Sequence, residues 1–366
     1  LKQRLGLHEF PVIRHRLQAF SPSYFQGDRT LFSYSQENAR TARVMTEKGK
    51  TPRVFLTKPL EEPDDAWTEV DLEDLCSFFA NPTRHLILRR LGISLTERFV
   101  GMEEKEPFDL AGLDAYLLAQ ELLERRLSGE DLGPLQEVLR ASGRLPHGSV
   151  GRCAFENLTA EVKAFAGEIE SLVGARELEP LLLTVSLGRF RIKGLLSGIT
   201  EEYLARVRYA RINAADRIGL WIRHALLNLI RPEGYPRTSM LIGRGPRRSS
   251  ARRVDLEYGP LEDAEKILEQ LLDVYWKGLR EPIHFFPDSS WTFARESLIK
   301  GTPPGEALEK AGRVWRGSIY DPAGGEQEDP YYELCFGEED PLDGAFCRLS
   351  LDVFLPQFGA QKDPAC

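Results

Sequence analysis

The sequence predicts a mixed α/β (α+β) fold, and three observations carry this prediction. The chain has 366 residues, of which 42% are hydrophobic and 28% charged, so it can bury a sizeable core. Apolar residues recur at helical spacing from Asp71 onward, whereas a block near residues 181–212 alternates like short strands. Helical spacing then resumes and continues toward the C-terminus. We therefore expect helices before and after a short run of strands.

The first 70 residues differ from the rest of the chain. Aromatic patches such as "FSPSYF" are broken by Ser, Pro and Gly, and "TKPLEEPDDAW" resembles a linker. We expect residues 1–70 to form an extended N-terminal arm that packs on the following domain. The chain begins with Leu and lacks a basic start and an apolar run, which indicates a fragment of a longer protein without a signal peptide.

A helical subregion is expected over residues 71–145. Apolar residues at helical spacing lie on both sides of Asn81-Pro82, which predicts a helix, a turn marked by proline and a second helix. Two further helices are expected over residues 110–127, with Asp109 as N-cap, and over residues 132–145, with Pro134 near the first turn.

An α/β core is expected over residues 146–356, followed by a flexible tail at residues 357–366. A long helix should follow Gly148, two strands should flank Gly188, and a third strand should cover residues 203–212. A helix over residues 214–230, a hairpin over residues 238–260 and later helices complete the prediction. The sequence thus orders a helix, three strands, a helix and a strand.

Several functional classes lack their sequence signals. No apolar run is long enough for a membrane span, and no GxxxxGK[ST] phosphate loop is present. The six histidines show no metal-ligand spacing, so each is expected to be a packing or surface residue. The cysteines show no CxxC pair, which favours reduced thiols in the cytoplasm, and we expect no metal and no cofactor in this domain. They are Cys76, Cys153, Cys335, Cys347 and Cys366.

A basic segment interrupts an otherwise acidic chain. The net charge is −8, yet the segment from Arg231 to Arg253 holds seven arginines and one acidic residue. Arginine forms bidentate contacts with phosphate, so this segment and the preceding strand are candidate DNA contacts, with a solvated loop as the alternative. The candidate DNA-binding residues are Arg206, Arg208, Arg211, Arg244, Arg247, Arg248, Arg252 and Arg253.

The order of elements is that of a restriction-endonuclease-like, or PD-(D/E)XK nuclease-like, core: a mixed central sheet flanked by helices, here with an N-terminal arm and helical insertions. Four segments in collinear order also resemble the RecC C-terminal domain family of the RecBCD helicase–nuclease, exodeoxyribonuclease V. They are "LQAFSPSYF" (17–25), "LEDLCSFFANPTRHLILRRLGISL" (72–95), "LPHGSVG" (145–151) and "GLREPIHFFPDSSW" (278–291).

The resemblance implies a bacterial, cytoplasmic subunit of a complex that unwinds and degrades double-strand DNA ends in recombinational repair. Its implied partners are RecB-type and RecD-type subunits, the N-terminal part of the same RecC chain, double-stranded DNA ends and the separated single strands. ATP and Mg²⁺ would belong to the partner subunits. The family's domain is nuclease-like in fold but lacks the active site, so we expect no catalysis here.

The residues at the implied nuclease positions agree with that expectation. Active relatives place a His on the first helix, an Asp after a strand glycine, and an acid followed two positions later by Lys, and the acids bind Mg²⁺. The corresponding residues in this sequence are Arg152, Ser197, Arg208 and Ala210. Without carboxylates the site would hold no metal.

Two alternatives stay open from the sequence alone. Glu156 and Asp216 are acids near the expected site, so an active Mg²⁺-dependent nuclease with a rearranged site is one alternative. We expect Glu156 to face solvent and Asp216 to cap or join the first turn of a helix. A pure protein-interaction domain is the other alternative. Aromatic residues near the arginines are candidates for base stacking, although Trp221 and Trp276 fit helix stripes and favour core packing. The other candidates are Tyr209, Tyr235 and Tyr275.

Overall fold

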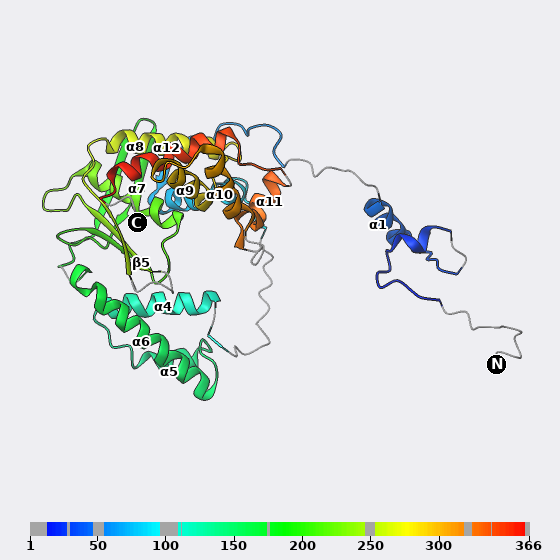
Figure 1. The fold of residues 1–366 in the computed structure, drawn as a ribbon, viewed down its shortest axis with the longest axis horizontal. Coiled ribbons are helices and arrows are strands. Elements are labelled where there is room, and N and C mark those ends of the chain that lie inside the picture. The colour runs from blue at the N-terminus through cyan, green and yellow to red at the C-terminus, as the bar shows by residue number, and fades with distance from the viewer. Residues whose placement is uncertain are drawn as a thin grey trace, which may run out of the picture. The chain divides into compact units, whose positions relative to one another are not determined.

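The computed structural model describes residues 13–27, 30–46, 55–95, 109–110, 112–173, 176–245, 253–317, 324–337 and 339–362 (Figure 1). Contacts divide the chain into two units, Leu1–Val54 and Phe55–Cys366. The first unit holds a 3₁₀ turn at Pro22–Phe25 and helix α1, Gln36–Thr46, within the segment expected to be extended. Among its described residues only Tyr24 and Ala42 are buried, so this unit has little core of its own.

Near its start, the second unit contains two helical segments separated at a proline, as predicted. A 3₁₀ turn at Asp65–Thr68 and strand β1, Glu69–Asp71, lead into α2, Leu72–Ala80. The Asn81 side chain accepts a hydrogen bond from Arg84 N and so caps α3, Pro82–Arg84. A π-helical stretch, His85–Arg90, follows directly.

The helical subregion contains α4, Gly112–Leu127, and α5, Leu135–Ala141. Asp109 precedes the start of α4 by three residues and bonds Leu110 N instead, so its predicted role as N-cap was wrong. Helix α6 runs from Gly148 to Val173 as predicted. Buried apolar residues of these helices form one cluster with Tyr209, Met240 and Ile242.

Within the described residues, six strands form two small mixed sheets rather than the single central sheet that was expected. They include β2, Leu181–Leu187, β3, Phe190–Leu196, β4, Leu204–Val207, β5, Ser239–Arg244, and β6, Arg253–Tyr258. The strand orders are β1-β3-β2 and β4-β5-β6. An antiparallel bridge between Ile199 and Leu204 and a 2.8 Å bond from Ala205 N to Gly198 O connect the end of β3 to β4. The two sheets separate because β4 goes on pairing with β5 after its contact with the residues that follow β3 has ended.

The order α6, β2, β3, β4, α7, β5 is the order that the sequence predicted. Strands β4 and β5 are parallel, and α7, Ala214–Ile230, connects them. Strands β5 and β6 form the expected antiparallel hairpin. Leu241 of β5 packs in the cluster with α7, whereas Ile242 packs with the α4 and α6 cluster. The second sheet therefore has helices on both faces (Figure 1).

Close packing explains a glycine that the sequence attributed to a nuclease motif. A Cβ on Gly194 of β3 would lie 2.5 Å from the Leu72 Cβ. Helix α2 therefore rests directly on β3, and a side chain at position 194 would push the helix away.

The remaining helices follow β6. They are α8, Ala264–Gly278, α9, Pro287–Leu298, α10, Pro304–Arg316, α11, Pro330–Phe336, and α12, Gly344–Ala360, with a 3₁₀ turn at Glu326–Glu328. Helix α12 continues beyond residue 357, where a tail was expected. Phe358 is buried and Gln361 bridges Tyr258, so the packed chain extends through Lys362.

Candidate nucleic-acid interface

The candidate site lies where the chain leaves β4. Arg208 N still donates to Ile242 O of β5 at 2.9 Å, but β3 no longer accompanies the strand. The side chain of Gln120 from α4 takes the place of a neighbouring strand. Its Nε2 donates to Val207 O at 3.2 Å and its Oε1 accepts from Tyr209 N at 2.8 Å. No sequence pattern pointed to Gln120, which lies about ninety positions before its partners.

An ion pair lies next to the end of β4. Asn213 and Asp216 form a capping box at the start of α7, in which each side chain accepts from the other residue's backbone N–H at 2.9 Å. The prediction that Asp216 caps or joins the first turn is thus confirmed. The Arg208 guanidinium pairs with the same carboxylate, and both side chains are about three-quarters buried. Burial acts to lower the pKa of Arg208, but the Asp216 carboxylate outweighs it and the pKa lies above its ordinary value.

The ion pair opens onto a cleft of about 360 Å³ between β4, α2, α4 and α7. Residues two apart on a strand share a face, so Arg206 and Arg208 both contribute to this side. Arg223 of α7 also lines the cleft, together with Tyr116, Gln120 and Cys76. We call this feature the arginine cleft. Three arginines face a single lining carboxylate, that of Asp216.

Arg223 is held firmly in the wall of the arginine cleft. Its Nη2 donates to both Glu73 carboxylate oxygens at 2.5 and 2.6 Å, and its Nη1 donates to Gly219 O at 2.7 Å. The arginine side chain is 10% exposed, whereas Glu73 is 67% exposed. Glu73 is therefore a surface carboxylate that neutralises a buried cation. Burial also raises the pKa of the neighbouring Cys76 thiol to about 11.

Arg206 has a different environment. Among the residues that the structure describes, none forms a hydrogen bond or an ion pair with its guanidinium. The guanidinium nitrogens are not fully buried. Burial, and then the positive charge of Arg223, lower its pKa. Arg206 is therefore a partly buried cation without a matching anion.

The other candidate DNA-binding arginines fall into three groups. Arg244 lies 4.4 Å above the Tyr209 ring and 3.5 Å from Glu161, and Arg253 donates to Glu168 O and pairs with Asp255, each at 2.7 Å. Arg211 is exposed. Arg247, Arg248 and Arg252 lie outside the described residues.

The structure does not gather all the implied nuclease positions in the arginine cleft. Arg152 is exposed on α6, Ser197 follows β3, and Ala210 O accepts from Arg244 N at 2.8 Å, and none of the three lines the cleft. Glu156 is exposed on α6, as expected. Within the described part of the chain, His, Cys, Asp and Glu form no group of three that could hold a metal ion.

Most of the aromatic candidates belong to the core. Trp221 and Trp276 are buried, as predicted, at 0% and 7% exposure. Tyr209 and Tyr275 are buried too, with ring contacts to Phe165 and Phe78, so their faces are closed to a nucleic-acid base. Tyr235 is partly exposed, and its hydroxyl donates to Glu179 O.

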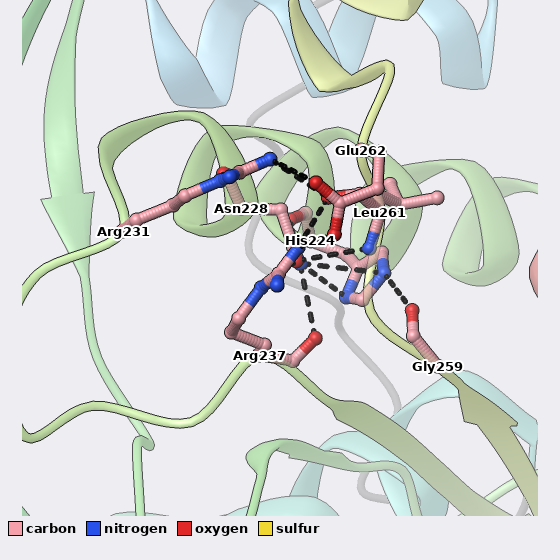
Figure 2. Close-up of polar contacts among 7 residues, drawn as sticks. All are labelled: His224, Asn228, Arg231, Arg237, Gly259, Leu261 and Glu262. Carbon is pink, nitrogen blue, oxygen red and sulfur yellow. Dashed lines mark hydrogen bonds and ion pairs between the residues drawn. The ribbon is translucent and has the colours of Figure 1, made fainter.

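A second polar cluster lies on the other half of α7 and is shown in Figure 2. His224 Nε2 donates to Gly259 O at 3.0 Å, so its Nδ1 accepts from the Ser239 hydroxyl at 2.8 Å. Burial lowers the pKa of His224 to about 4, so the ring is neutral near pH 7. Its packing role was predicted, but its partners were not visible in the sequence.

Asn228 completes this histidine network. Its Nδ2 donates to His224 O and Arg237 O at 3.0 and 3.1 Å, and its Oδ1 accepts from Leu261 N at 3.0 Å. Arg231, with a left-handed φ of 49°, and Arg237 both pair with Glu262 (Figure 2). The histidine network therefore ties α7 to the start of β5 and to the loop that follows β6.

Comparisons with known proteins show which sequences the chain resembles. The sequence model of the RecC C-terminal domain matches residues 67–298. The "RecBCD enzyme subunit RecC" of Escherichia coli K12 is 27% identical over 280 residues, which are 75% of this chain and 23% of that protein. Its counterpart from Mycolicibacterium smegmatis is 28% identical over 296 residues, 77% of this chain and 26% of that protein.

A RecC subunit from Buchnera aphidicola of Acyrthosiphon pisum is 23% identical over 327 residues, covering 87% of this chain. The chain spans less than a third of the length of these relatives, at most 29%. Among the described helices, none has both the length and the apolar content that crossing a bilayer requires.

The fold and the site define a mixed α/β domain, mostly helical, with two small sheets and a basic cleft beside its crossover helix. The match to the family model covers well over half of the chain. The chain belongs to the RecC C-terminal domain family.

Proposed function

We propose that this chain is a non-catalytic, nuclease-like scaffold and DNA-contact domain of a RecC-type subunit. In this proposal it acts in a cytoplasmic RecBCD complex with RecB-type and RecD-type subunits and with the rest of its own RecC chain. That complex unwinds and degrades double-strand DNA ends, while ATP and Mg²⁺ are bound by the partner subunits. The name shared by the relatives, "RecBCD enzyme subunit RecC", supports membership of such a complex.

The order of elements supports the nuclease-like part of the proposal. A long helix precedes three strands, and a helix then connects two parallel strands. The residues that follow β3 meet the start of β4 through one antiparallel bridge and one backbone hydrogen bond; the two strands then separate, and the arginine cleft opens beside β4. Strand ends that diverge next to a crossover helix are where α/β folds commonly place a ligand site.

The observation that carries the non-catalytic part is the pairing of Arg208 with Asp216. A working nuclease of this class needs free carboxylates that bind Mg²⁺. Asp216, the one acid lining the cleft, accepts from Asn213 N and from the Arg208 guanidinium. Its charge is therefore already neutralised. The guanidinium supplies the positive charge that a metal would bring, but it cannot generate a hydroxide nucleophile.

A cleavage assay tests the non-catalytic part. The 366-residue chain should leave linear duplex and single-stranded DNA intact in Mg²⁺ and in Mn²⁺. Metal-dependent cleavage that disappears in Glu156→Ala or Asp216→Ala would establish the rearranged nuclease instead.

Binding to a forked duplex tests the DNA contact. We expect salt-dependent binding that weakens at least tenfold when Arg247, Arg248, Arg252 and Arg253 become Ala, because each lost phosphate contact lowers the affinity. A matched control replaces four arginines from exposed ion pairs and so removes the same charge. Equal losses in both variants would contradict this placement of the contact, and an absence of binding would favour a pure protein-interaction domain. The control residues are Arg89, Arg140, Arg191 and Arg313.

A further inference from the structure

We propose that the arginine cleft is a binding site for one phosphodiester group of a DNA strand, with Arg206 as its principal ligand. The inference rests on the proposed DNA contact and assigns it a second location, separate from the arginines of the hairpin connection. Arg206 projects from β4 into the cleft and has no ionic partner among the described residues.

The charges around the cleft point to an anion. Arg208 is neutralised by Asp216, and Arg223 is neutralised by Glu73. Arg206 remains as one uncompensated positive charge in a partly buried position, where an unpaired cation is costly. Burial and the positive charge of Arg223 lower the pKa of Arg206, and the Glu73 carboxylate offsets this only in part. A bound phosphate would offset that cost.

The geometry of the walls suits a phosphate that belongs to a strand. The guanidinium of Arg223 is fixed by four hydrogen bonds, to Glu73, Gly219 and Cys76, so the wall of the cleft is preorganised. Tyr116, whose ring lies 5.5 Å from the Arg208 guanidinium carbon, also lines the cleft and is partly exposed. The cleft is open and its volume of about 360 Å³ exceeds that of a phosphate alone. A sugar-phosphate backbone fits this shape, because it enters and leaves through an open side.

The charge of Glu73 affects how strongly the cleft should attract an anion. Glu73 is two-thirds exposed and lies at the start of α2, where it holds the Arg223 guanidinium from outside the cleft. Removing its charge would leave Arg223 uncompensated next to Arg206. The site should then attract phosphate more strongly, so a single exposed residue provides a gain of binding as a test.

The experiment measures the fluorescence anisotropy of a labelled oligothymidylate and of a forked duplex with the 366-residue chain. Arg206→Gln should weaken binding of the single strand about tenfold at low salt and reduce the salt dependence by about one phosphate contact. Arg206→Lys should restore part of the affinity, because it keeps the charge but loses the fork of donors. Glu73→Gln should tighten binding about threefold. Arg313→Gln, which removes one charge from an exposed pair on α10, should change the affinity less than twofold.

The outcomes separate this inference from the proposed function. DNA binding that is unchanged in Arg206→Gln and Glu73→Gln overturns the cleft site and leaves the hairpin contact standing. A chain that binds no DNA overturns both. A thermal shift with inorganic pyrophosphate that depends on Arg206, without DNA binding, identifies a small free anion and also overturns the strand site. Competition by polyglutamate as strong as by the oligonucleotide would identify an acidic peptide instead.

Discussion

The two halves of α7 carry polar clusters of opposite character. In the histidine network every side-chain group of Asn228 has a partner, and His224 donates and accepts once each. In the arginine cleft the cations outnumber the lining carboxylates, and Arg206 has no partner among the described residues. A buried network in which every polar group has a hydrogen-bond partner stabilises a fold. A cluster with an uncompensated charge favours the binding of a ligand of opposite charge. The same helix thus supports structure on one half and, in our proposal, recognition on the other.

The largest expected effect breaks the histidine network. Asn228→Ala leaves the Leu261 N–H and the Arg237 carbonyl without their buried partner, so the free energy of unfolding should fall by about 3 kcal/mol. Urea denaturation measures this free energy, and the dependence of the unfolding free energy on urea concentration should be the same as in the wild type. Arg206→Gln, from the cleft, should change stability by no more than about 0.5 kcal/mol. Similar losses of unfolding free energy in Asn228→Ala and Arg206→Gln would show that the two clusters do not differ in their contribution to stability.

A smaller effect depends on pH. The pKa of His224 is about 4 in the folded chain and near 6.5 when unfolded, so the unfolded state binds the proton more tightly. Stability from this group is full above pH 6.5 and is lost as the pH falls toward 4. Buried His85, also with a pKa of about 4, acts in the same direction. Each histidine should cost about 2 kcal/mol between pH 7 and pH 5.

His224→Gln provides the check on that pH dependence. The variant is destabilised at every pH, but between pH 7 and pH 5 it should lose about 2 kcal/mol less stability than the wild type, because the contribution of this histidine is gone. Unfolding free energies measured at pH 5, 6 and 7 give the slopes. A variant with the wild-type slope would show that His224 is already charged in the folded state.

The smallest expected effect lies at the start of α7. Asp216→Ala removes half of the capping box and the partner of Arg208, so unfolding should become easier by about 1 kcal/mol. Arg208→Ala keeps the capping box and should cost less than Asp216→Ala. Thermal unfolding of the two variants compares them. If Arg208→Ala proved the more damaging, the ion pair and not the cap would be the main role of Asp216.

The elements that the sequence located are those with long apolar stripes. Helices α6, α7 and α8 and the hairpin β5–β6 follow from spacing alone. Helix α9 begins with Pro-Asp-Ser-Ser, which resembles a loop, and β1 has only three residues, so neither was recognised. The single sheet was wrong because strand spacing says nothing about which neighbours a strand keeps along its length.

The candidate site was visible only in part. Arg206, Arg208 and Asp216 lie within eleven residues of one another and stood out as charges near a strand end. Gln120 of α4 and Glu73 of α2 come from other helices and meet these residues only through tertiary packing. Arg223 lies on α7 with Asp216, but its contacts with Glu73 were not visible in the sequence. The roles of Arg152, Ser197 and Ala210 as former nuclease positions stay predictions, because they depend on an alignment of motifs and not on a contact.

Gln120 has a consequence for the behaviour of the chain in solution. A strand whose outer edge is free can pair with a strand of another molecule and so begin aggregation. Beyond Ala205 the outer edge of β4 loses β3, but the amide of Gln120 occupies the Val207 carbonyl and the Tyr209 N–H. A single side chain from a helix therefore seals this edge against strand addition from another molecule, at the point where the two sheets separate.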